Sequence, residues 1–416
     1  MVALWRRWRI RILLFLAVLG PGFITANVDN DPNGIFTYSQ AGAQYGYALL
    51  WTMIPITLAL IVVQEMCARM GVVTGKGLSD LIREEFGLRL TVIVLLLLVL
   101  VNFGNVIGEF SGIAASLDLF HLSKYISVPV CSVLVWLLAV RGDYKSVEKI
   151  FLTASVFYIA YIVAGVLSQP SWHTALVATV KIPPRSAWTH DYLFLVISVI
   201  GTTIAPWMQF YLQSTIVEKG VSVKNYAASR LDVIVGSIFT DIVAWFIIVA
   251  CAATLYMHGQ GAIRDASDAA QAMKPLAGQY AFLLFAFGLF NASFFAASVL
   301  PLSTAYVVCE GLGLESGVDK KFSEAPAFYW LYTILIAGGA AVVMIPNFPL
   351  IKWSITSQAL NGVLLPVVIV LMLLLINRKD LMGEYANSRW FNIAAWLTAG
   401  IVSVLSLMLM VQQFRS

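Results

Sequence analysis

The sequence predicts an all-α integral membrane protein made of two five-helix repeats of inverted topology, followed by an eleventh helix. Three observations support this prediction: the composition, the recurrence of long apolar runs, and two helix breaks at corresponding places in the repeats. Of the 416 residues, 60% are hydrophobic and 12% are charged, and the mean hydropathy is +0.85. Soluble domains carry about 25% charged residues, so this chain is expected to lie in a lipid bilayer.

Apolar runs of about 20 residues, each long enough to span a bilayer as a helix, recur along the whole chain. We expect spanning segments at 11–44 (broken), 48–69, 90–117, 126–140, 150–168, 192–217 (broken), 231–257, 280–309, 327–345, 350–376 and 391–412. The segments between them are too short to bury a core of their own. Residues 1–416 are therefore predicted to form a single transmembrane domain.

The distribution of basic residues predicts the orientation. With the N-terminus in the cytoplasm, all but seven of the 26 Lys and Arg residues fall on the inner side. Those seven are Lys124, Lys181, Arg185, Arg264, Lys274, Lys352 and Arg415. This bias follows the positive-inside rule and supports eleven spans in a cell (plasma) membrane. The C-terminus is then expected to be extracytoplasmic.

The first spanning segment is interrupted by two acids, Asp29 and Asp31, which stand beside Pro32 and Gly34. A charge at membrane depth costs roughly 2.5–3.5 kcal/mol, so it usually faces a partner or an aqueous pathway. Pro and Gly also break the helix and free backbone carbonyls, which are tolerated where they line a cavity. Carboxylate and carbonyl oxygens together are the ligands of a hard cation, so we expect an ion site here.

A second break, Gly201-Thr-Thr-Ile-Ala-Pro206, interrupts the sixth segment. Matched breaks in helices 1 and 6 indicate two inverted repeats with the substrate near the membrane midplane between them. The repeats are expected at about 11–168 and 192–376, and the helix at 391–412 is an addition. Two unrelated proline kinks are the alternative, and the acids at the first break speak against it.

The sequence resembles the Nramp family of divalent-metal transporters along most of its length. The first two helices of that family resemble Gly20–Gly34, Gln40–Tyr47 and Gly71–Lys76, its sixth resembles Gly201–Pro206, and its tenth resembles Ser357-Gln358 with Pro366. The resemblance implies a LeuT-like fold with discontinuous helices 1 and 6. It also implies a metal site at those two breaks.

This chain departs from the family at the residues that bind metal. The family signature D-P-G-N reads Asp31-Pro32-Asn33-Gly34 here, with Asn and Gly exchanged. The family has a methionine before the proline of helix 6, and this chain has Ala205. Because a thioether favours soft metals and oxygen favours Mg²⁺, losing the sulfur removes the discrimination against Mg²⁺. The Ala205 carbonyl, freed by Pro206, remains a possible ligand or water partner.

The proton-coupling groups of the family are also replaced. Trp207 and Gln213 stand where helix 6 has histidines, and Asn102 and Asn105 stand where helix 3 has two acids. None of these four side chains titrates, which indicates facilitated transport without protons. Glu109, one turn beyond Asn105, is a possible displaced titratable group, so proton coupling stays open as an alternative.

Together the departures resemble the Nramp-related magnesium transporters, a divergent branch for which Mg²⁺ and Mn²⁺ are the implied substrates. Mg²⁺ keeps several waters, so we expect a polar cavity with few direct ligands. The expected metal residues are Asp31, Asn33, Gly34, Ala205, Thr202 and Gln209, and the secondary candidates are Asp29, Asn102, Asn105, Glu109, Asn291, Gln358 and Asn361. Each polar side chain alone is more often an inter-helix hydrogen-bond partner than a ligand.

The leading hypothesis is a transporter of partly hydrated Mg²⁺ and of Mn²⁺ that works by alternating access without protons. The alternative is a proton-coupled Mn²⁺/Fe²⁺ importer of the ordinary Nramp type. A sodium-coupled carrier of amino acids or similar solutes, and a channel, are further alternatives. No enzyme motif is recognised. No cofactor, nucleic acid or obligate protein partner is expected, and the partners are the metal ion and the bilayer.

Overall fold

The computed structural model describes residues 20–141, 158–259, 261–273, 278, 281–318 and 320–413. Within these ranges every regular element is helical, and eight helices are long and apolar enough to cross a membrane. Large apolar side chains face outward from them, such as Leu100 and Leu397, which are 68% and 62% exposed. An apolar exterior of this kind belongs to a multi-pass membrane protein whose outer surface contacts lipid.

Each of the two broken segments is a pair of short helices. The first comprises α2 (Pro21–Asn27), the 3-10 turn η1 (Val28–Asn30) and α3 (Pro32–Tyr45), and the second comprises α11 (His190–Thr203) and α12 (Pro206–Glu218). Pro32 and Pro206 both stand at the first position of a helix. Proline is accommodated there because its missing N–H has no helical acceptor. The predicted breaks in helices 1 and 6 are confirmed.

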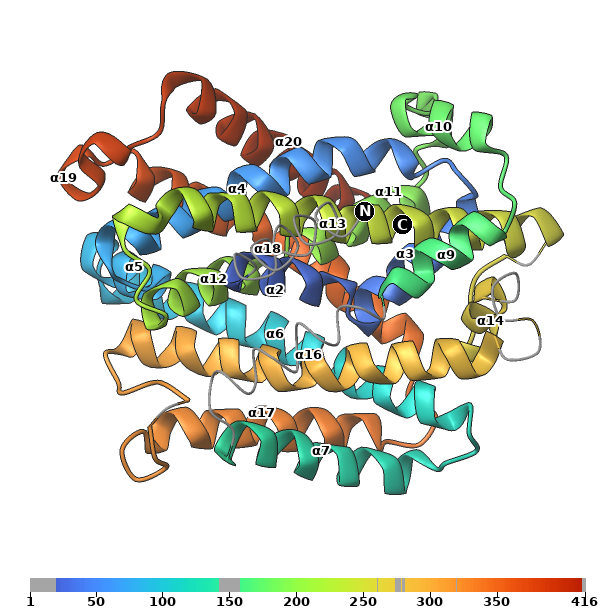
Figure 1. Ribbon diagram of the computed structural model, residues 1–416, viewed down its shortest axis with the longest axis horizontal. Coiled ribbons are helices and arrows are strands. Elements are labelled where there is room, and N and C mark those ends of the chain that lie inside the picture. The colour runs from blue at the N-terminus through green and yellow to red at the C-terminus, as the bar shows by residue number, and fades with distance from the viewer. Residues whose placement is uncertain are drawn as a thin grey trace, which may run out of the picture.

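The remaining helices surround these two pairs (Figure 1). They are α4 (Met53–Thr74), α5 (Leu78–Phe86), α6 (Leu88–Asp118), α7 (Lys124–Arg141), α9 (Ile159–Leu167), α10 (Trp172–Val180), α13 (Tyr226–Thr254), α14 (Ala266–Ala270), α16 (Ala281–Leu312), α17 (Pro326–Val343), α18 (Leu350–Ile376), α19 (Lys379–Met382) and α20 (Arg389–Gln413). Helices α7 and α17 form one outer layer, against α6 and α16. Helix α13 packs on α2, α3 and α4, and α18 packs on α6 and α11.

The start of α2 is held by a carboxylate from another helix. Asp232 of α13 accepts hydrogen bonds from the backbone amides of Gly20 at 2.8 Å, Gly22 at 2.7 Å and Phe23 at 3.2 Å. The first amides of a helix lack intrahelical acceptors and favour negative charge, so Asp232 acts as a cap supplied from α13. This contact fixes the half-helix that leads into the first break.

The predicted spans agree closely with the observed helices: 90–117 is α6, 350–376 is α18, and 391–412 is α20. Three predicted spans are described only in part, because residues 1–19, 142–157 and 280 lie outside the described ranges. The sequence analysis missed α5 and α10, which were assigned to connecting segments. Each has only nine residues, below the length that an apolar run needs to indicate a span. The predicted repeat boundaries stay a prediction.

Helix α11, the first half of the second broken segment, lies in backbone contact with α18. A β-carbon on Gly201 would lie 2.0 Å from the carbonyl oxygen of Gln358 and 2.4 Å from the amide of Gly362. A β-carbon on Gly362 would in turn lie 2.6 Å from the carbonyl oxygen of Ile197. Both positions therefore require glycine, because the two helix backbones approach each other closely there. Small residues commonly allow such close approach at helix interfaces in membranes.

Replacing Gly201 by Ala is expected to force α11 and α18 apart. Overpacking of this kind costs about 1–3 kcal/mol, so the melting temperature of the purified protein should fall by at least about 3 °C. The matched control is Gly400→Ala in α20, where an added β-carbon has no atom within 4 Å. That variant should melt at an unchanged or slightly higher temperature, since Ala favours helix over Gly. Equal melting temperatures for both variants would contradict the close contact.

Candidate metal site

Asp31 lies at the first helix break and caps α3. Its backbone is extended, with φ −68° and ψ 174°, and its Oδ1 accepts a hydrogen bond from the amide of Gly34 at 2.7 Å. The residue is only 5% exposed. A side-chain oxygen at this position satisfies an amide in the first helical turn and orients the carboxylate. Gly34 thus supports Asp31 through its backbone amide. The group of Gly34 that faces the carboxylate is this N–H, a hydrogen-bond donor.

Asn33 connects Asp31 to Glu109 of α6. Its Nδ2 lies 3.3 Å from Asp31 Oδ2, 2.6 Å from Glu109 Oε1 and 3.4 Å from the carbonyl oxygen of Asn105. Asn33 and Glu109 are both fully buried. One amide nitrogen therefore stands between two carboxylates in the interior of the protein, and Glu109 joins the site more directly than its rank as a secondary candidate predicted.

Two polar atoms of this group have no hydrogen-bond partner among the described residues: Asn33 Oδ1 and Glu109 Oε2. Gly108 makes room for the Asn33 amide, because a β-carbon at Gly108 would lie 1.7 Å from Asn33 Oδ1. Buried polar atoms usually find a partner, so each orphan calls for an explanation such as an ion or a water. Both atoms are oxygens. One belongs to Glu109 itself, and the other belongs to the Asn33 amide that contacts both carboxylates.

A cluster of three amides extends the site along α6 and α18. Asn105 Nδ2 donates to Asn361 Oδ1 at 3.0 Å, and Asn105 Oδ1 accepts from Asn361 at 3.2 Å and from Gln358 at 3.3 Å. Asn361 also donates to Gln358 Oε1 at 2.8 Å. Asn105 is one helical turn from Glu109, so the structure brings these candidates together beside the acids. Their oxygens can bind a hydrated cation.

At the second break Ala205 is extended, with φ −65° and ψ 137°, and precedes Pro206 at the start of α12. Its carbonyl oxygen accepts from the amide of Met208 at 3.1 Å and from Gln209 Nε2 at 3.3 Å. The expectation that this carbonyl is free is wrong for this conformation, since α12 and Gln209 both occupy it. The breaks nevertheless face each other: Tyr38 of α3 and Thr203 of α11 share a hydrogen bond of 2.7 Å.

The other predicted residues are placed as follows. Thr202 is buried at the end of α11, and Gln209 Oε1 lies 3.7 Å from Cys67 Sγ. Asn102 donates to Thr304 Oγ1 at 2.9 Å, away from the carboxylate pair. Asn291 is half-buried on α16, and the side chain of Asp29 lies outside what the structure describes.

Within the described residues no group of three or more His, Cys, Asp and Glu side chains comes together as a metal cluster. The site instead consists of two carboxylates and several amide oxygens. Oxygen-only donors of this kind suit hard divalent cations, which keep waters in their remaining positions.

Comparison with known proteins shows the family to which the chain belongs. A family model described as "Natural resistance-associated macrophage protein-like" matches residues 22–412. The chain belongs to the Nramp family. The divalent metal cation transporter MntH of Klebsiella pneumoniae (strain 342) is 26% identical over 395 residues, which cover 93% of this chain and 92% of that protein.

Two solved structures support the fold. A manganese transporter of Eremococcus coleocola, in complex with an aromatic bis-isothiourea substituted compound, superposes with a TM-score of 0.76 at 23% identity over 94% of this chain and 86% of that one. Mhp1, a nucleobase-cation-symport-1 family transporter in a closed conformation, superposes with a TM-score of 0.61 at 14% identity over 94% of this chain and 90% of the other. The predicted LeuT-like fold of this Nramp protein is thereby confirmed.

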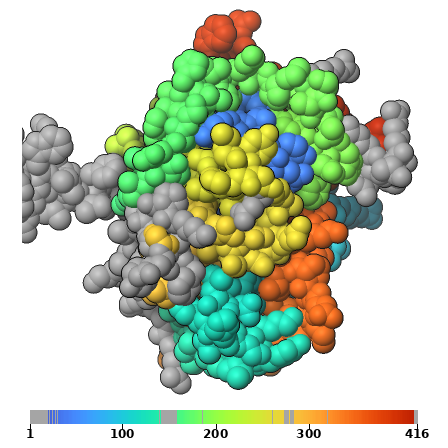
Figure 2. Space-filling model, turned by 90° about the vertical axis from the view of Figure 1, so that its right-hand side faces the viewer, coloured from blue at the N-terminus to red at the C-terminus, as the bar shows by residue number. Residues whose placement is uncertain are grey.

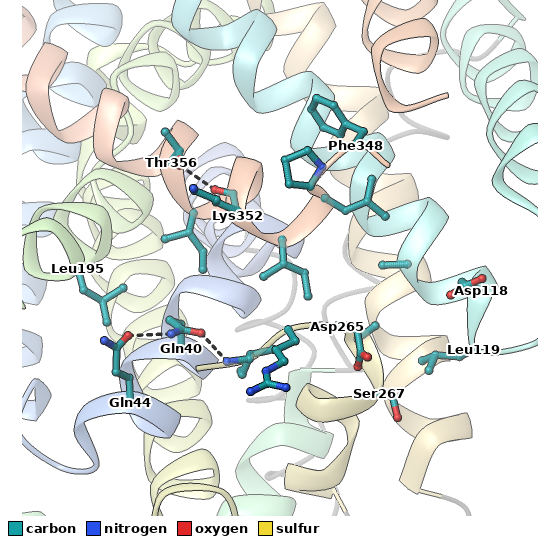
Figure 3. A pocket seen from close by; sticks show the side chains of 18 of the residues that line it. Gln40, Gln44, Asp118, Leu119, Leu195, Asp265, Ser267, Phe348, Lys352 and Thr356 are labelled. Atoms are coloured by element: carbon teal, nitrogen blue, oxygen red, sulfur yellow. Dashed lines mark hydrogen bonds between the residues drawn. The ribbon is translucent and has the colours of Figure 1, made fainter. Parts of the chain in front are cut away.

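A cavity of about 1130 Å³ lies at the end of the Nramp bundle that carries α14. Figure 2 shows this end, with the segment around α14 at its centre. Its polar lining includes Gln40, Asp118, Asp191, Asp265 and Lys352, and Figure 3 shows Gln40 bonded to Gln44 and to the backbone of Ile263. Ala115 also lines the cavity and lies six residues from Glu109, which is about 9 Å along α6. The carboxylate pair and this cavity, here called the vestibule, therefore share α6 but lie at different levels along it.

The sequence analysis did not identify the vestibule. Its lining comes from the ends of α3, α6, α11 and α18 and from the segment between α13 and α14. Such residues share no spacing or motif, because only the tertiary fold brings them together. No signal in the single sequence could have found them.

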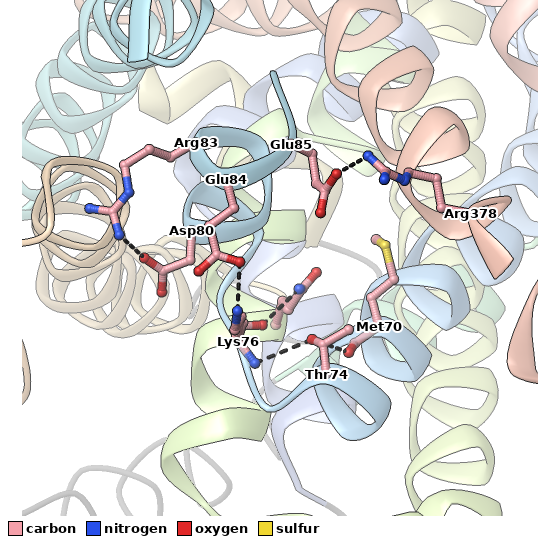
Figure 4. A network of polar contacts seen from close by, with 9 residues as sticks. Met70, Thr74, Lys76, Asp80, Arg83, Glu84, Glu85 and Arg378 are labelled. Atoms are coloured by element: carbon pink, nitrogen blue, oxygen red, sulfur yellow. Dashed lines mark hydrogen bonds and ion pairs between the residues drawn. The ribbon is translucent and has the colours of Figure 1, made fainter. Parts of the chain in front are cut away.

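The opposite end of the molecule is tied together by ion pairs (Figure 4). Lys76 pairs with Glu84 at 2.5 Å, and Arg378 pairs with Glu85, joining α5 to the segment before α19. Behind them Gln213 of α12 donates to the carbonyl oxygen of Lys76 at 2.9 Å. Gln213 is therefore a contact of this end, and the structure places it away from the carboxylate pair.

Glu109→Gln is expected to weaken divalent-metal binding to the purified protein by about tenfold or more. A tenfold loss of affinity corresponds to about 1.4 kcal/mol of binding free energy. The change removes one of the two carboxylates of the candidate site and keeps the shape of the side chain. Isothermal titration with Mn²⁺ would measure it. Glu324→Gln makes the same change at an exposed position and should bind as the unmodified protein does. Equal affinities for the two variants would remove Glu109 from the site.

Proposed function

We propose that this Nramp protein is a transporter, rather than an enzyme, that carries partly hydrated Mg²⁺ and also Mn²⁺ across the membrane by alternating access. The observation that supports this most is the buried pair Asp31 and Glu109, which share one amide nitrogen of Asn33. Two ionised carboxylates repel each other strongly in a low-dielectric interior. One divalent cation balances both charges.

The named relatives support the class of substrate. The Klebsiella pneumoniae relative is called a divalent metal cation transporter, and the Eremococcus coleocola relative is called a manganese transporter. A chain of the same family, with two acids and a polar cluster at the helix break, is well suited to the same class of ion.

The choice of Mg²⁺ rests on the chemistry of the second break. Ala205 has no sulfur, and its carbonyl oxygen is already bonded to Met208 and Gln209. Residue 205 itself therefore offers no soft ligand that would favour a transition metal over Mg²⁺. It also leaves coordination positions for water, which Mg²⁺ retains.

Entry from the outer vestibule and release at the opposite end give uptake. We place the N-terminus and the ion-paired end at α5 in the cytoplasm of a cell (plasma) membrane, in agreement with the basic residues. A divalent ion then gains about 4.6 kcal/mol per 100 mV, twice the value for a single charge. No proton gradient is needed for accumulation.

A proton-coupled Mn²⁺/Fe²⁺ importer is the second candidate function, and one observation favours it. Glu109 Oε2 is fully buried and has no partner among the described residues. A carboxyl group in that state can hold a proton when the metal is absent. Proton coupling would then require that this proton crosses the membrane in the same transport cycle as the metal.

Uptake of Mg²⁺, Mn²⁺ and Ca²⁺ into proteoliposomes, with internal pH recorded, tests the proposal. Mg²⁺ should enter and compete with Mn²⁺, and the internal pH should stay constant. Asp31→Ala should reduce uptake to the level of empty liposomes, because it removes the capping carboxylate from the site. If Mg²⁺ fails to compete with Mn²⁺, the magnesium proposal is wrong, and acidification during Mn²⁺ uptake would select the second candidate.

Ala205→Met is expected to shift the preference toward Mn²⁺, because it introduces a thioether at the second break. The ratio of Mn²⁺ to Mg²⁺ uptake at equal concentrations should rise by about tenfold, the equivalent of about 1.4 kcal/mol. Ala205→Leu adds similar bulk without sulfur and is the matched control. An identical ratio for both variants would mean that residue 205 does not contact the metal.

A further inference from the structure

The segment that leads into the first helix break is held by one face of α13. Asp232, Gly236 and Thr240 are spaced four residues apart, so they follow one another along the same face of that helix. Asp232 caps the start of α2, and a β-carbon on Gly236 would lie 2.7 Å from the Cα atom of Phe23. Helices α2 and α13 therefore lie in close contact before the chain reaches the break.

Thr240 is the next residue on this face, and it contacts the break itself. Asn30, the last residue of η1, donates from Nδ2 to Thr240 Oγ1 at 2.7 Å, and the same nitrogen lies 3.4 Å from the carbonyl oxygen of Thr240. Both residues are fully buried. Only the nitrogen of an amide side chain can donate to a carbonyl oxygen, so the two acceptors on Thr240 fix the orientation of the Asn30 side chain.

This contact carries the side chain of Asn30. Its Oδ1 has no hydrogen-bond partner among the described residues, so within them the side chain is held through Nδ2. A 3-10 turn has poorer hydrogen-bond geometry than an α-helix, and η1 has only three residues. The position of η1 therefore depends on the helix against which it is bonded, which is α13.

Asp31 directly follows Asn30, so a displacement of Asn30 also displaces Asp31. The amide of Asp31 donates to the carbonyl oxygen of Val28 at 3.1 Å, which closes η1, and its carboxylate accepts from the amide of Gly34 at 2.7 Å. Asp31 is thus held by α3 on one side and by η1 on the other. Glu109 belongs to α6, so a shift of η1 along α13 changes the separation of the two carboxylates.

We propose that Thr240 is a positioning residue for the metal site: its hydroxyl holds Asn30 and thereby sets where the Asp31 carboxylate stands relative to Glu109. This inference rests on the proposed function, and it adds a residue of α13 that no motif indicated. Thr240 acts through Asn30 and does not itself bind the metal. Groups that orient a ligand from behind typically contribute tenfold or more to metal affinity.

Isothermal titration of the purified protein with Mn²⁺ tests this role. Thr240→Val keeps the shape of the side chain and removes the acceptor, and it should weaken Mn²⁺ binding by about tenfold. Thr240→Ser keeps the hydroxyl and should bind Mn²⁺ within about twofold of the unmodified protein. A role in stability alone would not separate these two variants by the presence of one oxygen.

Thr215→Val is the matched control, because Thr215 is also buried but donates to its own helix, to the carbonyl oxygen of Tyr211 at 2.8 Å. It should keep the affinity for Mn²⁺, even where its melting temperature falls as far as that of Thr240→Val. Asn30→Leu removes the donor from the other side and should give the same loss as Thr240→Val. The double variant should bind no more weakly than either single one, since both changes remove one hydrogen bond.

Two results would overturn this inference alone: Mn²⁺ binding by Thr240→Val as tight as that of the unmodified protein, or binding by Thr240→Ser as weak as that of Thr240→Val. Losses that simply add in the double variant would also overturn it, because Asn30 and Thr240 would then act separately. Absence of divalent-metal binding in the unmodified protein is a different result, and it would overturn the proposed function together with this inference.

Discussion

The amide of Asn33 between two buried carboxylates is the interaction on which the rest of the site depends. It keeps Asp31 and Glu109 within reach of one atom, although their charges repel each other in a low-dielectric interior. Asp31 belongs to a helix break and Glu109 to a continuous helix, so the amide also joins a broken segment to the surrounding bundle. Gly108 is part of the same arrangement, since only a residue without a side chain leaves room for Asn33.

The two ends of the molecule differ in a way that gives the site a direction. One end has a polar cavity whose lining includes Ala115, six residues from Glu109 on α6, and the other end carries the ion pairs of α5 with its neighbours. Between them, the amides of Asn105, Gln358 and Asn361 form a polar layer next to the carboxylates. Under the proposed function, an ion that enters from the cavity would exchange water for protein oxygens in stages.

Much of the fold could be predicted from the sequence, because breaks at proline and long apolar runs are local signals. Asp31 and Asn33 were predicted for the same reason: they stand beside Pro32 in an apolar segment. The direct contact of Glu109 with Asn33 could not be predicted, since it depends on how α3 crosses α6 and on the space at Gly108. The bonding of the Ala205 carbonyl was mispredicted, because Ala205 is the N-cap of α12 and its carbonyl accepts from the first turn of that helix, from Met208 N and Gln209 Nε2.

The backbone contact at Gly201 and Gly362 determines which parts can move. Since α11 and α18 touch through main-chain atoms, they have no room to slide or rotate independently and behave as one rigid unit. A movement of α12 relative to this unit then has to change the backbone at Ile204 and Ala205, the two residues between α11 and α12. Under the proposed function, the hinge of the transport cycle would thus lie at the second helix break itself.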